Sequence, residues 1–402
     1  MGAHVLACAL LPALAGARRA VPVFTVNLDA PPETRFLSIV PTFNKTVWTF
    51  WDRFFAKDAV LRDALYALVD LRGEENAEMQ AELNGLANAS KLNIKFLQGV
   101  QMLYELQTIM VPIVNMSHDA ATTFNLPGGV DAYNHTRPWS RTAARGWEAL
   151  TRMPRGPGCT GIIALDKSDG TVNHARNLDF PPADLMTDMV YTAIFTKGGK
   201  ELFRSQMAAG YQQLITGMRR GPNGYAIERN TRYADHVGGF DETMKHLVGG
   251  RTLNGWTLRK IMEAHADYES ATAAIAQAQY ASPEYAIVSG VKKGLIYARD
   301  PGYVAHTQTL GKHNFDERDD YIIITNFDFF WHDIREYFDP TGGSIGPNTR
   351  RVVAQRRLNA SSVLTPEVLF EAINGKGTIA DTIFQAIINV EKDIWNVSLP
   401  EV

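Results

Sequence analysis

The pattern of apolar positions divides the chain into a first part with helical periodicity and a second part rich in strand patterns. From Val47 to Leu71 apolar residues recur every three or four positions, which is the spacing of one helix face, and residues 77–111 continue in the same way. A short apolar stretch at 21–28 predicts a strand ahead of them. We therefore expect the first 110 residues to be mostly helical.

Residues 112–158 differ from their surroundings, because Gly, Pro and polar residues are frequent there. This composition predicts an irregular segment. Strand patterns begin at residue 159 and return at about 284–327, with helical patterns between them at about 240–280 and again from Pro366. Two runs of strands, separated and followed by helices, predict sheets with helices packed outside them.

The apolar runs on either side of residues 167–170 predict a β-hairpin with those four residues as its loop. In this register Gly161 faces Arg176, and Gly158 faces Asp179. A slip of one residue would turn the side chains to the other face of the sheet, but the two strands would stay neighbours. The residue that follows Gly158 therefore lies beside the second strand.

Composition and the N-terminus indicate a secreted or lumenal chain. Residues 1–17 contain an apolar run that is too short to cross a bilayer and is followed by small residues, as in a signal peptide. A buried N-terminal strand or helix is the alternative. Asn-X-Ser/Thr sequons, which act as glycan acceptors only in the secretory route, are more frequent than chance predicts. They lie at Asn44, Asn88, Asn115, Asn134, Asn359 and Asn396.

The charge pattern and the spacing of possible metal ligands limit the classes of partner and cofactor that the chain could bind. The net charge is −3, with acidic and basic residues mixed along the chain, so nothing indicates a nucleic-acid surface. No group of His, Cys and carboxylate residues has the spacing of metal ligands. We therefore expect neither a metal nor another cofactor.

The chain has two cysteines, and Cys159 is the only one that remains once the leader is removed. A lone cysteine in an oxidising compartment forms an intermolecular bridge, is buried and inert, or is reactive. Arg176 on the facing strand would favour the thiolate and lower the pKa of the thiol, and Asp179 could hold that arginine or orient a second group. His174 is a candidate base for the thiol, with strand packing or solvent exposure as the alternative.

Cleavage of the Gly158–Cys159 bond would supply a different base. The freed α-amine has an ordinary pKa of about 7.7–8.0. It belongs to the same residue as the thiol and can take its proton, as in N-terminal-nucleophile enzymes. The irregular segment before Cys159, and the strand that begins there, fit such a cleavage site.

The stretch CTGIIALDKSDGTVNHARNLDF at 159–180 resembles the nucleophile segment of the acid ceramidase and N-acylethanolamine acid amidase family. These are lysosomal N-terminal-nucleophile amidases, distantly similar to bile-salt hydrolases and penicillin V acylases. Further resemblance lies in VFTVNLDAPPETRF at 23–36, ITNFD at 324–328 and the segment 348–374. It covers about 21–402, with a gap near 107–158.

The resemblance implies an α+β fold, the N-terminal-nucleophile αββα sandwich, in which two packed antiparallel sheets are flanked by helices. It implies that a mostly helical α-subunit or propeptide at 18–158 follows the signal peptide at 1–17. The catalytic β-subunit would be 159–402. The active protein would then be a heterodimer of its own two cleavage products.

The resemblance also implies roles for individual residues. Cys159 would be the nucleophile and, through its α-amine, the base. Arg176 and Asp179 would lie beside it, Asn326 would donate a hydrogen bond to the oxyanion, and Arg350 would brace the site.

Asn230 and Thr231 match positions that line the substrate site. Three departures from the family pattern stand out: Thr231 replaces a usual Glu, Gly161 replaces a usual Ser, and about 45 extra residues precede the cysteine. The missing Glu puts fine substrate positioning in doubt, and the extra residues could cover the site in the uncut chain.

The activity implied is hydrolysis, in the lysosome, of an N-acylated lipid through a thioester. The lipid would be ceramide, cut to sphingosine and fatty acid, or an N-acylethanolamine, cut to ethanolamine and fatty acid. We expect the activity to peak below neutral pH. A cluster of aromatic residues would either meet a lipid surface or a lipid-presenting activator, or pack in the core. These residues are Trp48, Phe50, Trp51, Phe54 and Phe55.

Two other functions stay open. One is a penicillin-V- or bile-salt-type acylase, against which the leader, the helical first part and the internal cysteine argue. The other is a secreted binding protein without catalysis, in which the cysteine is inert. That protein would not be cleaved at Gly158–Cys159, and Cys159→Ala would leave its function intact.

Overall fold

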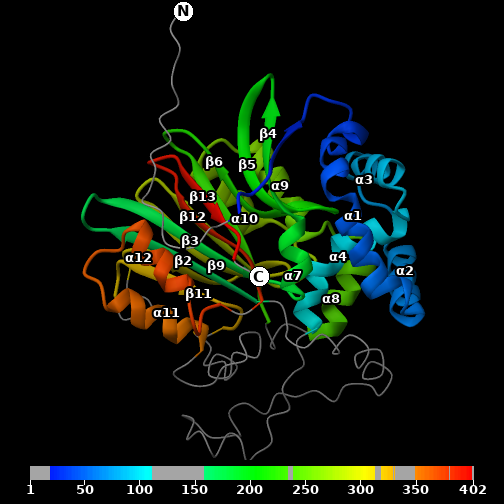
Figure 1. Ribbon diagram of the computed structural model, residues 1–402. Coiled ribbons are helices and arrows are strands. Elements are labelled where there is room, and N and C mark those ends of the chain that lie inside the picture. Colours follow the sequence, from blue (N-terminus) through cyan, green and yellow to red (C-terminus); the bar gives the residue numbers. More distant parts are fainter. Residues whose placement is uncertain are drawn as a thin grey trace, which may run out of the picture.

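Two β-sheets pack face to face with helices on both outer sides in the computed structural model, which describes residues 19–110, 158–233, 239–312, 318–328, 330, 349–379 and 381–400 (Figure 1). The predicted αββα sandwich is confirmed. The larger sheet has the order β1-β4-β5-β6-β7-β8-β9-β10, and the smaller one the order β11-β2-β3-β12-β13. Apart from the parallel pair β1–β4, the neighbouring strands whose register is known are antiparallel.

The strands of the larger sheet are β1 (Val23–Asn27), β4 (Val190–Lys197), β5 (Lys200–Ala208), β6 (Tyr211–Arg219), β7 (Tyr225–Thr231), β8 (Glu284–Gly290), β9 (Lys293–Asp300) and β10 (Tyr303–Thr309). Those of the smaller sheet are β2 (Gly158–Asp166), β3 (Thr171–Asp179), β11 (Tyr321–Ile324), β12 (Thr382–Asn389) and β13 (Ile394–Ser398). The predicted hairpin register is confirmed, because Gly161 pairs with Arg176 and Gly158 pairs with Asp179.

The layer between the sheets consists largely of β-branched side chains, which favour strands. Ile163 of β2, Ile287 of β8 and Ile322 of β11 are fully buried in one apolar cluster there. Helices α9 (Asn254–Ala264) and α10 (Tyr268–Gln277) cover the larger sheet. Helices α11 (Arg350–Asn359) and α12 (Pro366–Ile373) cover the smaller one (Figure 1).

The first segment of the chain, which is described over residues 19–110, is helical as expected. Its helices are shorter than the apolar pattern suggested. They are α1 (Val40–Trp51), α2 (Ala59–Arg72), α3 (Ala77–Ser90) and α4 (Ile94–Met110). A π-helical turn, Asp52–Ala56, ends α1, and the carboxylate of Asp58 accepts from the backbone of Leu61 and caps α2. The chain therefore breaks between the two apolar stripes that one long helix would have joined.

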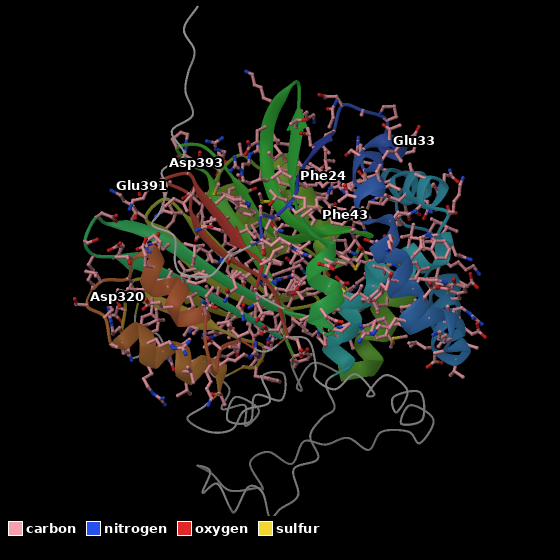
Figure 2. The ribbon with its side chains drawn as sticks, viewed as in Figure 1. Phe24, Glu33, Phe43, Asp320, Glu391 and Asp393 are labelled. Carbon is pink, nitrogen blue, oxygen red and sulfur yellow. The ribbon has the colours of Figure 1, made fainter. Side chains whose placement is uncertain are left out.

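The first segment is built into the body of the protein. Strand β1 lies parallel to β4 at the edge of the larger sheet. Phe24 of β1 and Phe43 of α1 lie side by side, with ring centroids 5.8 Å apart (Figure 2). Both rings also pack against Tyr191 of β4. The helices α7 (Ala183–Met186) and α8 (Gly239–Val248) complete the α-helices of the described residues, which also include three short 3-10 helices, Pro32–Thr34, Leu37–Ile39 and Thr187–Met189.

Two of the predicted segments lie outside the described residues. These are the leader at 1–17 and, apart from Gly158, the irregular segment 112–158. The boundaries of the proposed subunits stay predictions. Within the described ranges, no helix has the length and apolar character needed to cross a membrane.

Candidate active site

Cys159 is the second residue of β2 and its side chain is only 2% exposed. Its sulfur is a free thiol. Arg176 on the neighbouring strand β3 approaches it from one side, with Nη2 3.7 Å from Sγ. The hydroxyl of Tyr104, from helix α4, lies 3.4 Å from Sγ. The predicted neighbour Arg176 is thus in contact with the thiol.

The backbone of Cys159 is held by two residues that come from far along the chain. Its nitrogen donates to Oδ1 of Asn326 over 2.8 Å, and its carbonyl oxygen accepts from Nη1 of Arg350 over 2.9 Å. Arg350 also contacts Asp179, at 3.2 Å, and donates to Oδ1 of Asn326 over 3.0 Å. The structure brings these four predicted site residues together, and their catalytic roles stay predictions.

Asn230 and Thr231 end strand β7 next to this group. Asn230 accepts from Nη1 of Arg176 over 3.4 Å through its side-chain oxygen. The side chain of Thr231 points elsewhere and donates to Oε1 of Gln107 in α4 over 2.9 Å. Its backbone carbonyl accepts from the amide nitrogen of Asn326 over 2.8 Å. Thr231 is therefore linked to the site through its backbone.

His174 is not positioned to act as a base for the thiol. It pairs with Ile163, four residues further along β2 than Cys159, which corresponds to about 13 Å along a strand. Its ring nitrogens lie 2.9 Å from Glu228 Oε2 and 3.0 Å from Ser289 Oγ. The alternative interpretation, a strand-packing histidine, is the one the structure supports.

The electrostatics of the thiol differ from the prediction. Burial raises the pKa of the Cys159 thiol above its usual value, whereas Arg176 and the contact with Tyr104 act to lower it. The expected contribution of Arg176 has the predicted sign, but burial, which was not predicted from the sequence, outweighs it and sets the net direction. The reason is that removing the sulfur from water penalises the thiolate more than one guanidinium stabilises it. The intact chain thus keeps the sulfur largely protonated.

The sequence did not predict a second group of buried residues, which holds Tyr104 and Arg176 in place next to the thiol. Tyr104 donates to the backbone carbonyl of Arg229 over 2.8 Å, and Arg176 donates to the same carbonyl over 2.9 Å. The side chain of Arg229 is itself fixed between two buried carboxylates, 2.8 Å from Glu105 and 2.5 Å from Glu284. No local motif marks this set, because its members come from α4, β3, β7 and β8.

An apolar pocket opens beside the thiol. Two of its lining residues tie it to Cys159: Tyr104, whose hydroxyl faces the sulfur, and Leu178, the β3 residue paired with Cys159. Further lining side chains come from both segments of the chain. They include Val47, Phe50, Phe96, Met186, Ile215 and Ile383.

The aromatic cluster of the first segment packs in the core. Phe50 and Phe55 are each 4% exposed, and Trp51 stacks on Phe55 with an interplanar angle of 10°. Trp48 and Phe54 are partly buried against the same core. The structure therefore favours core packing over a lipid-facing surface, although Phe50 also lines the apolar pocket.

The remaining predicted sites are of mixed exposure. Asn88 and Asn396 are exposed, and Asn44 and Asn359 are partly buried. Asn115 and Asn134 lie outside the described residues. Among the residues that the structure describes, no group of three or more His, Cys, Asp or Glu side chains is arranged to hold a metal ion.

Comparison with known proteins identifies relatives at modest identity. No family model matches the chain. The N-acylethanolamine-hydrolyzing acid amidase of Caenorhabditis elegans is 24% identical over 312 residues, which covers 76% of this chain and 74% of that protein. The Rattus norvegicus protein of the same name is 28% identical over 220 residues. That match spans 54% of this chain and little more than half, 56%, of the rat protein.

Acid ceramidase of Homo sapiens is 20% identical over 404 residues, covering 93% of this chain and 85% of the human protein. A solved structure of the Caenorhabditis elegans amidase ortholog matches with 23% identity and a TM-score of 0.47, covering 57% of this chain and 92% of its own. The resemblance of the sequence to acid ceramidases and N-acylethanolamine acid amidases is confirmed.

Proposed function

We propose that this protein is an amidase that hydrolyses N-acylated lipids, with Cys159 as its nucleophile after cleavage of the Gly158–Cys159 bond. One observation carries the proposal. The thiol lies 3.7 Å from Arg176, the nitrogen of the bond to be cut lies 2.8 Å from Asn326, and Tyr104, whose hydroxyl is 3.4 Å from the sulfur, lines an apolar pocket. The names of the relatives, an acid amidase for N-acylethanolamines and acid ceramidase, support the same chemistry.

Cleavage supplies the base that the intact chain lacks. In the uncut chain the Cys159 nitrogen is an amide and cannot accept a proton, while burial raises the pKa of the thiol. Hydrolysis of the peptide bond leaves the carboxylate of Gly158 and the α-amine of Cys159. The neutral amine then takes the proton from the sulfur of its own residue, which creates the nucleophile where the substrate binds.

The reaction proceeds through a thioester. The sulfur attacks the amide carbon of the lipid, and the carbonyl oxygen becomes an oxyanion. Asn326, through its amide nitrogen, is the proposed donor to that oxygen, and the protonated α-amine returns its proton to the leaving amine. Water then attacks the thioester, releases the fatty acid and regenerates the thiol. Arg350 and Asp179 keep the cysteine backbone in position through the contacts described above.

The apolar pocket is the proposed site for the acyl chain. Burying a methylene group stabilises binding by about 0.8 kcal/mol, so a pocket lined by Phe, Met, Leu and Ile side chains favours a long aliphatic chain. Ceramide and N-acylethanolamines share this amide-linked chain and differ in the amine that leaves. The proposal is therefore for the shared acyl amide.

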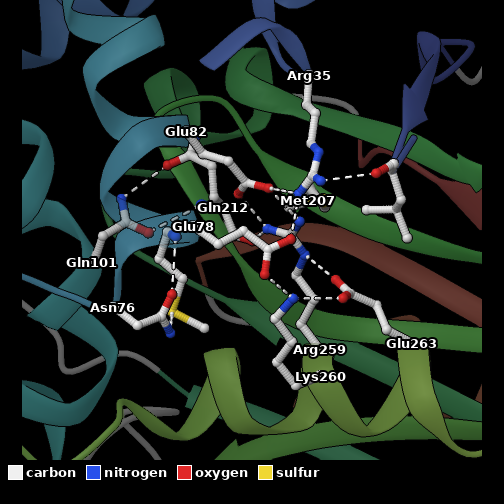
Figure 3. Close-up of polar contacts among 12 residues, drawn as sticks. Arg35, Asn76, Glu78, Glu82, Gln101, Met207, Gln212, Arg259, Lys260 and Glu263 are labelled. Atoms are coloured by element: carbon white, nitrogen blue, oxygen red, sulfur yellow. Dashed lines mark hydrogen bonds and ion pairs between the residues drawn. The ribbon is translucent and has the colours of Figure 1, made fainter. Parts of the chain in front are cut away.

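The two cleavage products are proposed to stay together as a heterodimer. A buried ion network joins α3 of the first segment to α9 of the second (Figure 3). Glu82, 1% exposed, contacts Arg259 at 2.6 Å and Arg35 at 3.0 Å. Glu78 extends the network to Arg35 over 2.6 Å and also pairs with Lys260. Together with the shared larger sheet, these contacts support an assembly that survives the cut.

The location of the protein is proposed from the same resemblance. A signal peptide at 1–17, glycans at the sequons and a lysosomal, acidic compartment stay predictions, as does the need for a lipid surface or an activator. The exposed Asn88 and Asn396 are accessible acceptors. Activity that peaks below neutral pH is the expected result in such a compartment.

N-terminal sequencing of the purified protein after incubation at acid pH tests the proposal. We expect a new chain that begins Cys-Thr-Gly-Ile-Ile, together with release of fatty acid from ceramide or an N-acylethanolamine. Cys159→Ala should abolish both, whereas Cys8→Ala, the same substitution in the leader, should abolish neither. An unbroken polypeptide that hydrolyses the lipids at full rate would refute the mechanism. Turnover of penicillin V or conjugated bile salts instead would favour the acylase alternative.

A further inference from the structure

Glu228 is a buried acid that the mechanism above does not use. It lies in strand β7 of the larger sheet, and its side chain is fully buried between the two sheets. Its carboxylate faces two residues of β3 in the smaller sheet. Oε2 is 2.9 Å from His174 Nε2, and Oε1 is 3.4 Å from Arg176 Nη1. Glu228 thus connects the sheets directly behind the thiol.

The carboxylate is itself held in position. The second ring nitrogen of His174 lies 3.0 Å from the hydroxyl of Ser289 on β8, the strand that pairs with β7. Ser289 is 1% exposed, and His174 has no exposed surface. A chain of polar contacts therefore runs from Ser289 through His174 to Glu228 and Arg176.

Arg176 passes this orientation on to the sulfur. Its Nη1 is the nitrogen near Glu228 and also donates to the carbonyl of Arg229, whereas its Nη2 points at Cys159 Sγ. A guanidinium is a planar, rigid fork, so fixing one of its nitrogens fixes the direction of the other. Displacing Glu228 would release one of the contacts that aim Nη2 at the thiol.

Gly161 leaves the space that Glu228 occupies. A Cβ atom on Gly161 would lie 2.8 Å from Oε1 of Glu228 and 2.5 Å from the tip of Ile287. Contacts this short force a neighbour to move. The Gly in place of the usual Ser at this position therefore has a structural counterpart on the facing sheet, the buried Glu228 side chain.

We propose that Glu228 is a positioning residue for the Cys159 reaction: anchored by His174 and Ser289, it aims Arg176 at the sulfur, and Gly161 keeps room for it. This inference rests on the proposed function for its kinetic test. The carboxylate has a second effect, because its negative charge acts to raise the pKa of the thiol, whereas Arg176 acts to lower it. The Glu228 side chain therefore has two consequences that can be measured separately: it orients Arg176 toward the sulfur, and its charge disfavours the thiolate of Cys159.

Glu228→Gln tests both consequences. It keeps the shape of the side chain and removes the charge that attracts Arg176. We expect kcat to fall about 10- to 100-fold with little change in KM, since a misaimed group near the chemistry affects the transition state. We also expect the pH midpoint for alkylation of Cys159 by a small reagent such as iodoacetamide to change. The control is Glu371→Gln, an acid on the exposed face of α12, which should leave that midpoint unchanged.

Gly161→Ala gives an independent test, because the new methyl group should displace Glu228. Alone it should lower kcat; in the Glu228→Gln background it should lower kcat by a smaller factor, since the contact with Arg176 is already weakened. Ser289→Ala, which removes the anchor of His174, should have a smaller effect in the same direction. These two variants decide the question if Glu228→Gln does not fold.

The proposal is overturned if the effects of Gly161→Ala and Glu228→Gln multiply independently. It is also overturned if Glu228→Gln leaves both kcat and the alkylation midpoint at wild-type values. Failure of the proposed function would look different, because the wild-type protein itself would neither be cleaved nor hydrolyse lipid. The alkylation measurement would still report the coupling of Glu228 to the thiol in that case.

Discussion

The backbone nitrogen of Cys159 donates a hydrogen bond of 2.8 Å to the side-chain oxygen of Asn326. Arg350 donates to the same oxygen, and the amide nitrogen of Asn326 donates to the carbonyl of Thr231. These three bonds determine the orientation of the amide, with its oxygen toward the nitrogen of the bond proposed to be cut. For Asn326 to serve as the oxyanion donor, its nitrogen must become available once the substrate binds.

Replacing Asn326 by Ala should slow lipid hydrolysis. Loss of one oxyanion donor typically lowers kcat about 100- to 1000-fold, and the substrate KM should change far less. Steady-state assays on the cleaved protein measure this directly. Asn84→Ala, on the exposed side of α3, is the control. Wild-type kcat in Asn326→Ala would exclude the proposed role.

Filling the apolar pocket should shorten the acyl chain that the enzyme prefers. Val47 lines the apolar pocket beside the thiol and also a second apolar pocket next to it. Val47→Phe should therefore lower kcat/KM for long-chain amides about tenfold more than for short-chain amides, because added bulk in a filled site costs roughly 1–3 kcal/mol. A series of N-acyl substrates of increasing length measures the shift.

The control for this prediction is the same substitution on the neighbouring helix. Val60 of α2 is 71% exposed, so Val60→Phe should leave the length preference as it is in the wild-type protein. Equal losses for all chain lengths in Val47→Phe would indicate that the acyl chain binds elsewhere.

Glu284 should make the folded protein more stable at mildly acid pH than at neutral pH. Burial raises its pKa from 4.5 to about 7, helped by Glu105 and opposed by Arg229. Because the folded state holds the proton more tightly than the unfolded state, stability is greatest below about pH 4.5 and declines as the pH rises toward 7. The shift corresponds to about 3 kcal/mol at most.

Urea unfolding at about pH 5 and pH 7.5 measures this effect. In Glu284→Gln the difference between the two pH values should shrink, because the group that titrates is gone. Glu371→Gln, on the exposed face of α12, should retain the wild-type difference. If the unfolding free energy of the wild-type protein changes between the two pH values by the same amount as that of Glu284→Gln, the prediction is wrong.

Breaking the buried network between α3 and α9 should separate the two cleavage products. Arg259→Met removes the guanidinium that pairs with Glu82, whose carboxylate has almost no access to water. Removing one partner of a buried pair costs about 3–5 kcal/mol. We expect the two pieces to co-elute in size-exclusion chromatography in the wild-type protein and to dissociate in the variant.

An exposed pair between the same two segments provides the comparison. Arg53 and Asp184 are 3.1 Å apart, with side chains 49% and 56% exposed. Surface pairs contribute about 0–1 kcal/mol, so Asp184→Asn should leave the assembly intact. If the two pieces dissociate in both variants, or in neither, the buried network is not what holds the two cleavage products together.

Local features of the fold were predictable because the residues that decide them are neighbours in sequence. The hairpin register that brings Arg176 to Cys159 follows from a four-residue loop between two apolar runs, and it is confirmed. The break after α1 was not predicted. The apolar period continues across it, and only the π-helical turn and the Asp58 cap interrupt the helix.

The residues of the site could be predicted where they lie in a recognisable sequence motif, and not elsewhere. Arg176, Asp179, Asn326 and Arg350 were expected from segments that resemble a family, and all four meet around Cys159. Their catalytic roles stay predictions.

Tyr104 and Glu228 were missed. Tyr104 reaches the sulfur from a helix 55 residues earlier in the chain, and Glu228 reaches Arg176 across the space between two sheets. Neither has a signal in its own neighbourhood.

The amino-acid sequence by itself determined the helical first segment, the hairpin and the place of Cys159 at the start of a strand, because periodicity, turn residues and composition act over a few positions. Only the tertiary structure decided the state of that thiol. Folding removes Cys159 from water, which raises the pKa of its sulfur even with Arg176 in contact. The balance between burial and charge depends on atoms contributed by α4, β3 and β7, and it exists only once those elements are packed together.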